Sequence, residues 1–229
     1  VIARRAERLE QLKKEVSVPL FVLPLDLTRA ESFETYRKTL EQRRPRVTLL
    51  INASGFGRFG RYDQIPLQDS LDMIDLNCRA LVHITQLTLP YLEKGAHVIQ
   101  IDSLSAFQPV PYLGVYGATK AFVLSYSRSL NAELAPRGIH MMAFCPGWVK
   151  TEFFDHAEQT SKTAVTYFNQ LFTAREVVAC ALRDSARGRD VCVPGFRIKL
   201  QVLLTKLLPH RLVMRIWLKQ QKHAGKTEA

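Results

Sequence analysis

The chain has 229 residues, of which 47% are hydrophobic, and its formal net charge is +11. This length and composition predict one substantial core and therefore a single large α/β domain over 1–229. The charge does not indicate nucleic-acid binding, because +7 of it falls in the segment 196–229 and no basic helix offers base-reading or stacking side chains. No apolar run reaches the roughly 18 residues that a membrane-spanning helix needs.

The cysteines and histidines do not form a recognisable ligand pattern. Cys78, Cys145, Cys180 and Cys192 are widely spaced and include no C-x-x-C pair. This spacing argues against a disulfide framework and a zinc site, and it favours a reducing, cytoplasmic setting. We expect no metal, and we expect the six histidines to lie on helices, at strand edges or at the surface: His83, His97, His140, His156, His210 and His223.

Strand-like apolar runs alternate with helical periodicities along the chain. The expected strands are 21–26, 47–52, 97–103, 140–147 and 191–195, and the expected helices are 6–14, 29–42, 67–92, 117–133 and 174–183. This alternation is typical of βαβ units around a parallel sheet with helices on both faces. Because ligands of such sheets bind beyond the carboxyl ends of the strands, the residues that follow each strand are the candidates for function.

The sequence "GFGRFG" at 55–60 fits the G-x-G-x-x-G spacing. In a dinucleotide-binding βαβ unit this motif opens a helix at once, and an acid that reads the ribose follows about 20 residues later. Here Pro66 precedes any helical pattern, and Asp75 lies in the middle of a helix. The spacing alone is therefore a weak indication of a pyrophosphate-binding loop.

A more specific pattern lies at 103–122. Tyr116 and Lys120 are four residues apart at the start of a helix, so both side chains project toward one point, and Ser103 ends the preceding strand 13 residues before the tyrosine. An adjacent ammonium lowers the pKa of a tyrosine from its ordinary value near 10. With Ser103 donating a hydrogen bond to an oxyanion, the group fits general acid-base catalysis. A Tyr–Lys pair considered alone is more often an ordinary surface pair.

These residues resemble the classical short-chain dehydrogenase/reductase family. The family's Y-x-x-x-K motif matches "YGATK" at 116–120, its catalytic serine matches Ser103, and its N-N-A-G stretch matches "NASG" at 52–55 with two departures in the middle. The resemblance implies a Rossmann-like, doubly wound parallel sheet in three αβα layers, with a catalytic core over 1–195. It also implies that "GFGRFG" is a wall of the cofactor cleft that stabilises the central sheet.

Further matches follow in the order of the family. Asn77 within "DLNCRAL" matches the helix asparagine that holds a water against the catalytic lysine. "PGWVKT" at 146–151 matches a stretch whose threonine reaches the nicotinamide carboxamide, and "DLT" at 26–28 resembles the acidic turn that meets the adenine. The resemblance thus implies a catalytic tetrad: Ser103, Tyr116, Lys120 and Asn77.

The start of the chain bears on the choice of cofactor. The end of the family's second strand falls on "VIARRAERL", which has Arg4 and Arg5 where an enzyme specific for NAD has an acid. NADP(H) is therefore favoured over NAD(H), although two solvated charges that open a helix give the same pattern. The expected cofactor contacts are Arg4, Arg5, Asp26, Leu27, Asn52, Ala53, Ser54, Gly55, Tyr116, Lys120, Pro146, Gly147, Val149 and Thr151.

The resemblance also implies a first strand and a glycine-rich T-G-x-x-x-G-x-G turn before Val1, which the sequence shown does not contain. That stretch would be roughly 30 residues, one strand and one helix of a βαβ unit. Without this central strand its neighbours would expose unpaired backbone groups. We therefore expect the natural protein to be longer.

The reaction that the resemblance implies is reversible hydride transfer between a nicotinamide and a carbonyl carbon. Tyr116 would donate the proton, Ser103 would hold the carbonyl oxygen, Lys120 would tune Tyr116 and bind the ribose, and Asn77 would relay protons through water. The family's variable lid follows Thr151, and its aromatic residues fit either an apolar pocket or packing on the core: Phe153, Phe154, Tyr167, Phe168 and Phe172. A small-molecule ketone, aldehyde or secondary alcohol with a bulky apolar part is the expected substrate.

The segment 196–229 is a basic helical tail. Leucines between Leu200 and Leu208 form an apolar stripe, and a second helix then sets apolar residues opposite Lys and Arg. Two interpretations of this tail remain. It contacts an anionic membrane surface through 196–222, or it covers the substrate pocket or a neighbouring subunit. Family likeness implies a homo-oligomer, a dimer or tetramer, formed through the helices at Leu67 and Gly117.

Two functions from different classes follow. The first is an NADP-dependent oxidoreductase that acts on a carbonyl or alcohol, and it is favoured by the intact tetrad. The second is a non-catalytic cofactor-binding or membrane-associated scaffold that retains the fold.

Overall fold

The protein folds around short parallel strands joined by helices, and the computed structural model describes the backbone of residues 1–227 and the side chains of residues 1–222. The strands are β1 (Ile2–Ala3), β2 (Leu23–Pro24), β3 (Val47–Asn52), β4 (Leu92–Ile101), β5 (His140–Phe144), β6 (Trp148–Val149), β7 (Leu171–Phe172) and β8 (Val191–Cys192). The helices are α1 (Ala6–Glu15), α2 (Ala30–Arg43), α3 (Leu67–Ile74), α4 (Leu81–Thr88), α5 (Gly114–Leu134), α6 (Phe153–Ala157), α7 (Ala174–Ala186), α8 (Phe196–Leu207) and α9 (His210–Thr227).

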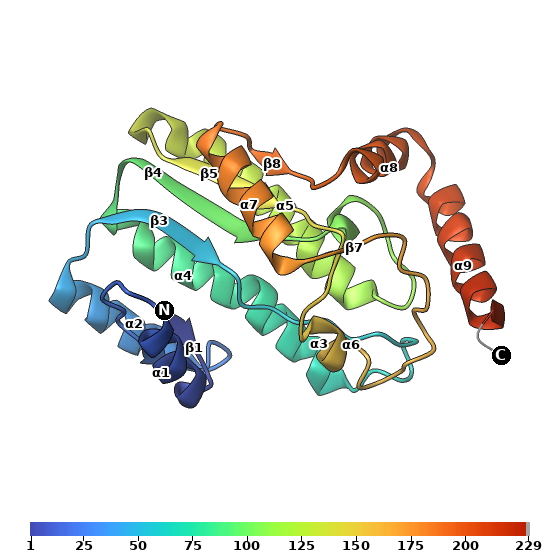
Figure 1. Ribbon diagram of the computed structural model, residues 1–229, viewed down its shortest axis with the longest axis horizontal. Coiled ribbons are helices and arrows are strands. Elements are labelled where there is room, and N and C mark those ends of the chain that lie inside the picture. The colour runs from blue at the N-terminus through green and yellow to red at the C-terminus, as the bar shows by residue number, and fades with distance from the viewer. Residues whose placement is uncertain (228–229) are drawn as a thin grey trace.

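The main sheet lies between two layers of helices (Figure 1). Its strands run parallel in the order β3-β4-β5-β8. Val98 of β4 packs with Leu130 of α5, whereas the next residue, Ile99, packs with Val177 of α7. Successive strand residues point to opposite faces, so the near-continuous apolar runs bury both faces of the sheet. The Rossmann-like fold with three αβα layers is confirmed.

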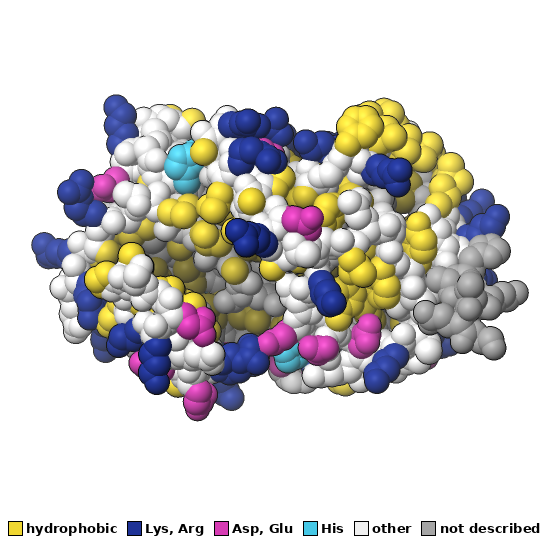
Figure 2. Space-filling view, in the orientation of Figure 1, with side chains coloured by type: hydrophobic (Ala, Val, Ile, Leu, Met, Phe, Trp, Pro, Cys, Tyr) yellow, Lys and Arg dark blue, Asp and Glu magenta, His cyan; other side chains and the backbone are white. Residues whose placement is uncertain are grey.

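The sheet is split near the N-terminus. β1 and β2 pair in a separate two-stranded parallel sheet and do not pair with β3. α7 covers one face of the sheet at β4 and β5 but does not cover the same face at β3. There Leu49 and Ile51 of β3 are 44% and 47% exposed. Figure 2 shows a hollow with hydrophobic side chains between the N-terminal elements and this edge. The split falls where the family resemblance predicts one more central strand.

The long helix expected over 67–92 is interrupted. A π-helical turn, Asp75–Ala80, separates α3 from α4, and β4 already begins at Leu92. The helix expected at Gly117 begins three residues earlier, at Gly114, so Tyr116 lies in the first turn of α5. These differences matter for function, because the π turn carries Asn77 and the first turn of α5 carries Tyr116.

The expected tail consists of two helices, α8 and α9, and its last residues, 228–229, lie outside the described part of the chain. Trp217 of α9 donates from Nε1 to the carbonyl oxygen of Pro111 at 3.0 Å, and Gln221 accepts from the N–H of Tyr167 at 3.0 Å. The tail is therefore joined to the core beside the loop that precedes α5. Over residues 1–227, no helix has both the length and the apolar character needed to cross a bilayer.

Candidate active site

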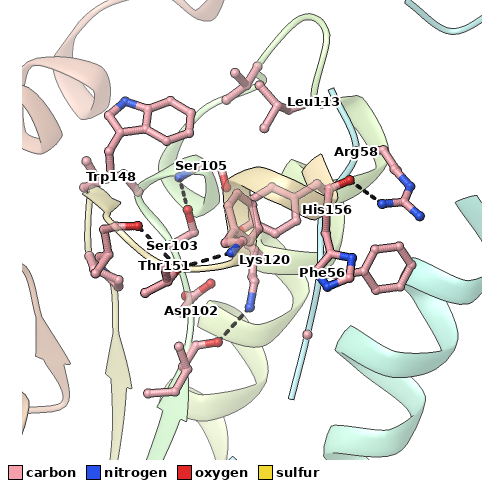
Figure 3. A pocket seen from close by; sticks show the side chains of 18 of the residues that line it. Phe56, Arg58, Asp102, Ser103, Ser105, Leu113, Lys120, Trp148, Thr151 and His156 are labelled. Carbon is pink, nitrogen blue, oxygen red and sulfur yellow. Dashed lines mark hydrogen bonds between the residues drawn. The ribbon is translucent and has the colours of Figure 1, made fainter. Parts of the chain in front are cut away.

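Three of the four expected catalytic side chains lie together where β4 ends and α5 begins. Ser103 follows β4, and Tyr116 and Lys120 lie one turn apart on α5, with all three lining the same cavity. Ser103 and Lys120 are labelled in Figure 3. Tyr116 is 8% exposed and Lys120 is 5% exposed. Burial of a phenol and an ammonium side by side is costly unless their polar atoms have partners, so the hydrogen bonds around them decide what they do.

Lys120 is held by the end of β4. Its Nζ donates a hydrogen bond to the carbonyl oxygen of Ile101 at 2.7 Å, and it lies 5.7 Å from the centre of the Tyr116 ring. Burial lowers the pKa of Lys120, whereas the nearby Asp102 carboxylate acts to raise it. The ammonium therefore has a fixed position between the strand end and the tyrosine.

The acidity of Tyr116 differs from the sequence-based expectation. Burial raises the pKa of Tyr116 above its ordinary value, while a hydrogen bond with Ser103 acts in the opposite direction. The lowering of the Tyr116 pKa that Lys120 was expected to cause is not found, because burial outweighs the other influences. Tyr116 is consequently a neutral phenol at pH 7, the form that can donate a proton.

Asp102 is an acidic residue of this wall that the sequence analysis missed. It is 3% exposed, its Oδ2 accepts from the Cys145 thiol at 3.4 Å, and its Oδ1 has no hydrogen-bond partner within the described residues. Burial raises the pKa of Asp102 to about 7, and Lys120 opposes this rise. The signal in the sequence was an acid placed directly before the serine at the carboxyl end of a strand.

Asn77 reaches the same region from the π-helical turn. Its Oδ1 accepts from the backbone N–H of Phe56 at 3.0 Å, and its Nδ2 donates to the Phe56 carbonyl at 2.9 Å and to the Thr119 hydroxyl at 3.1 Å. Asn77 is 1% exposed and does not line the cavity. Such π turns frequently occur at functional sites. Here the turn lets one amide fix the loop that follows β3.

The glycines of "GFGRFG" allow this loop to approach the catalytic side chains. A Cβ atom on Gly55 would lie 3.0 Å from Asn77 Oδ1 and 3.7 Å from Lys120 Nζ. A Cβ atom on Gly57 would lie 3.0 Å from the rings of both Tyr116 and Phe153. The motif is thus needed for close packing, and its residues Gly55, Phe56 and Arg58 line the cavity.

The cavity has a volume of about 1460 Å³ and extends from the β1–β2 sheet past the ends of β3, β4 and β5 to α8 and α9. This exceeds the roughly 300–1,000 Å³ of ordinary small-molecule sites, so a dinucleotide and a substrate fit together. All of the expected cofactor residues line the cavity except Asn52. The Asn52 amide instead donates to Thr85 at 3.0 Å and to Gln100 at 2.9 Å within the core.

Charged groups at the N-terminal end of the cavity fit a phosphate-bearing dinucleotide. Arg4 and Arg5 both line the cavity, and Arg5 pairs with Glu152 at 2.9 Å. At Asp26, burial acts to raise the pKa, but hydrogen bonds from Thr28 and the charge of Arg4 hold that pKa below its ordinary value. This end of the cavity thus combines the guanidinium ions of Arg4 and Arg5 with the ionised carboxylate of Asp26.

The opposite end of the cavity is mainly apolar. Of the expected lid aromatics, Phe153 and Tyr167 line the cavity. Phe154 and Phe168 instead pack against Trp148, with ring centres 5.8 Å and 4.9 Å away. Both expectations for the lid, a pocket lining and packing on the core, are therefore partly met. Phe172 belongs to the packing group, since its ring faces Gly147 and Gly195.

Other cavity residues were missed by the sequence analysis. Arg58 is 13% exposed in its side chain and donates from Nε to Asp69 Oδ2 at 2.7 Å and from its guanidinium to the His156 carbonyl. Ser105 has a hydroxyl with no hydrogen-bond partner in the described part of the chain. Arg58 lies inside "GFGRFG" and Ser105 two residues after Ser103, so both flank motifs that the sequence analysis had singled out.

Away from the cavity, the fold brings two distant cysteines together. The Sγ atoms of Cys180 and Cys192 are 3.6 Å apart, and Asp184 joins them in a group whose ligand atoms lie within 4.8 Å. The spacing along the sequence did not reveal this proximity, which arises because α7 packs on β8. Asp184 is already paired with Arg189 at 3.0 Å, which offsets its charge, and the four cysteines are free thiols.

The histidines are dispersed over the molecule. His83 stacks on Phe33 with ring centres 4.1 Å apart, and His97 on β4 approaches the Ser185 hydroxyl at 3.1 Å. Among the five histidines whose side chains the structure describes, only His156 lines the cavity. The side chain of His223 lies outside the described residues.

Known proteins resemble this chain in sequence and in fold. The family profile described as short chain dehydrogenase matches residues 1–162. Sulfoacetaldehyde reductase from Chromohalobacter salexigens is 34% identical over 156 residues, which cover 66% of this chain and 62% of that protein. The chain thus spans less than two thirds of the length of this relative.

Two solved structures share the fold over most of the chain. A short-chain dehydrogenase from Sphingobium yanoikuyae in complex with NADPH has a TM-score of 0.74 and 28% identity, with 85% of this chain and 77% of that chain covered. The bulky-bulky ketone specific alcohol dehydrogenase from Comamonas testosteroni has a TM-score of 0.68 and 26% identity, with 85% and 75% covered. From its motifs, its fold and the match over residues 1–162, the chain belongs to the short-chain dehydrogenase family.

Proposed function

We propose that the protein is an NADP-dependent oxidoreductase that interconverts a carbonyl group and an alcohol on an apolar substrate. The observation that carries this proposal is the convergence of Ser103, Tyr116 and Lys120 on one wall of a cavity that has room for a dinucleotide and a substrate. Residues 1–195 form the catalytic core, and the described part of the tail, 196–222, closes the substrate side.

Each catalytic side chain has a defined role. A nicotinamide dinucleotide, when bound, supplies or accepts the hydride. Tyr116 donates its proton to the carbonyl oxygen during reduction and recovers it during oxidation. Ser103 donates a hydrogen bond to the same oxygen. Lys120, whose Nζ is 5.7 Å from the tyrosine ring centre, stabilises the phenolate that forms and contacts the ribose.

Asn77 acts beside this group. It holds the backbone of Phe56 through two hydrogen bonds and thereby keeps Gly55 between its own amide and Lys120. We assign to Asn77 the binding of a water that passes protons to and from Lys120. Its test is separate from that of Tyr116, because Asn77→Ala should slow proton return without removing the proton donor.

NADP(H) is the proposed cofactor. Arg4 and Arg5 line the cavity where the family meets the ribose, and guanidinium groups bind phosphate well. Because Arg5 is already paired with Glu152 at 2.9 Å, Arg4 is the main candidate for the phosphate contact. The solved relative from Sphingobium yanoikuyae is a complex with NADPH, which agrees with this choice. Asp26, Gly147 and Thr151 are among the further proposed contacts.

The lining of the substrate side favours a bulky apolar carbonyl compound. Trp148, Phe153 and Trp217 line this end of the cavity. The guanidinium of Arg58 is bound to Asp69 at 2.7 Å, so its charge is already compensated and does not favour a small anionic substrate. Of the two relatives named for their substrates, the enzyme specific for bulky ketones is therefore the better guide.

We also propose a homo-oligomer, a dimer or tetramer. Leu71 and Ile74 of α3 and Phe122 of α5 are 45%, 47% and 43% exposed, and they lie on the helices through which the family resemblance implies subunit contact. Exposed apolar patches of this kind frequently mark subunit interfaces.

The test uses the full-length protein with NADPH or NADH and a panel of bulky ketones, aldehydes and small anionic aldehydes. We expect NADPH oxidation with the bulky ketones, followed by absorbance, and a loss of about 10²- to 10⁴-fold in Tyr116→Phe. NADPH binding, measured by its fluorescence, should be equal in both proteins. If wild type binds NADPH but reduces no carbonyl compound of the panel, the non-catalytic scaffold is favoured. If Tyr116→Phe keeps the wild-type rates, Tyr116 is not the proton donor.

A further inference from the structure

Helix α8 has two apolar faces that lie on opposite sides. Ile198 and Val202 are 1% and 8% exposed and pack into the core. Other apolar side chains recur at intervals of four, three and four residues, which places them in one stripe on the outward side. They are Phe196, Leu200, Leu203 and Leu207, with exposed fractions of 82%, 48%, 52% and 70%. Figure 2 shows hydrophobic side chains gathered in the region of α8.

Positive charge borders this stripe. At 100° per residue, Lys199 and Lys206 lie along one edge of the stripe and Arg197 lies along the other. The exposed side of α9 continues the pattern, with Leu212 and Ile216 43% and 45% exposed. Residues 196–222 contain no Asp or Glu, and their Lys and Arg residues are Arg197, Lys199, Lys206, Arg211, Arg215, Lys219 and Lys222. We call the outward sides of α8 and α9 the tail surface.

The tail surface lies next to the substrate end of the cavity. Leu204 and Leu208 line the cavity on the α8 side, and Ile216 and Trp217 line it on the α9 side. The same two helices therefore form part of the cavity wall and carry the apolar, cationic exterior. A compound that leaves an apolar phase at the tail surface has a short path to Tyr116.

We propose that the tail surface binds the surface of an anionic lipid bilayer, and that the protein takes its apolar carbonyl substrate from that bilayer. The stripe enters the boundary between headgroups and acyl chains, and the flanking Lys and Arg side chains reach the lipid phosphates. The second part of this inference rests on the proposed oxidoreductase function, whereas the first part does not.

The charges favour a bilayer over a second copy of the chain. In a two-fold interface each surface meets its own copy. The tail surface would then place seven Lys or Arg side chains against seven others, with no Asp or Glu from 196–222 to compensate them. Like charges brought together in this way are repulsive, whereas anionic headgroups neutralise them.

The first experiment measures sedimentation of the full-length protein with vesicles of phosphatidylcholine alone or of phosphatidylcholine with phosphatidylglycerol. Wild type should bind the anionic vesicles and lose binding at about 0.5 M salt. The variant Leu200→Gln/Leu203→Gln/Leu207→Gln should bind at least about tenfold less. A matched control, Leu12→Gln/Val18→Gln, changes exposed aliphatic residues near the N-terminus and should bind as wild type does.

A second arm separates the two proposals. NADPH oxidation with a long-chain ketone carried in anionic vesicles should be lost in the triple leucine variant, while oxidation with a water-soluble ketone should persist. Tyr116→Phe should bind vesicles normally, so its loss of turnover concerns only the catalytic proposal. Equal sedimentation of wild type and triple variant, or no sedimentation of either, overturns the bilayer proposal. A dimer in ultracentrifugation that the triple variant abolishes, without vesicle binding, identifies a second copy instead and also overturns it.

Discussion

The two walls of the cavity are built in different ways. The wall at the end of β4 and the start of α5 is polar and almost fully buried, with Tyr116, Lys120 and Asp102 at 8%, 5% and 3% exposure. The wall formed by α6, α9 and neighbouring loops is mainly aromatic, and Trp217 makes one hydrogen bond, to Pro111. The first wall holds polar groups that depend on one another for hydrogen bonds and charge. The second wall is an apolar surface that tolerates the replacement of one side chain by another. We therefore expect substitutions in the first wall to affect chemistry and those in the second to affect substrate choice.

The largest effect is expected for Lys120→Met. This change keeps the aliphatic stem but removes the ammonium that donates to Ile101, so carbonyl reduction should fall by about 10²- to 10⁴-fold. Steady-state rates of NADPH oxidation measure the effect. Lys38→Met, at a side chain that is 62% exposed, is the control and should retain full activity. A Lys120→Met enzyme with more than a tenth of the wild-type rate would show that the polar wall does not carry the chemistry.

The next largest effect is expected for Gly57→Ala. The new methyl group would lie 3.0 Å from the Tyr116 ring, and displacement of the proton donor by about 1 Å costs on the order of 100-fold in rate. Overpacking should also lower the free energy of unfolding by about 1–3 kcal/mol. Gly114→Ala is a matched control, because no atom lies within 4 Å of its added Cβ. Equal rates and urea midpoints for the two variants would contradict the tight contact between this loop and Tyr116.

Asp102→Asn should change how stability depends on pH. The pKa of Asp102 is raised from 3.8 to about 7 in the folded protein, so the folded chain holds a proton that the unfolded chain has lost between these values. The free energy of unfolding therefore falls as pH rises through this window. The asparagine variant removes this slope, which amounts to about 3 kcal/mol between pH 5 and pH 8.

Urea unfolding of wild type and variant at both pH values measures this slope. Asp26→Asn is the control, because the pKa of Asp26 is held below its ordinary value and its effect lies at more acidic pH. Parallel pH profiles for wild type and Asp102→Asn would mean that Asp102 does not retain a proton in the folded wall.

The smallest effect is expected on the aromatic wall. Trp217→Phe keeps an aromatic ring but removes the hydrogen bond to Pro111, which is worth about 0.5–1.5 kcal/mol. The KM for a bulky ketone should rise about threefold to tenfold, while kcat stays close to that of wild type. A comparable loss in kcat would mean that the aromatic wall also positions the reacting group, and the contrast between the two walls would not hold.

The sequence predicted features that depend on spacing along one element. Tyr116 and Lys120 share a face because a helix repeats every 3.6 residues, and Ser103 joins them because a parallel strand ends beside the helix that follows it. The same reasoning did not predict the π turn that carries Asn77, whose side-chain amide is bound to the backbone of Phe56, 21 residues away. The sequence analysis also missed Asp102, because its neighbours along the chain do not show that α5 and β5 bury it.

By itself, the sequence determined the alternation of strands and helices, the parallel sheet and the positions of the Tyr-Lys and serine motifs, because these follow from local periodicity and from the order of elements. Only the tertiary structure decided which groups are buried together. It raised the pKa values of Tyr116 and Asp102, brought Cys180 within 3.6 Å of Cys192, and turned one leucine stripe of α8 outward. These outcomes depend on contacts between distant segments, and such contacts set solvent exposure and the cost of charge in ways that spacing along the chain does not encode.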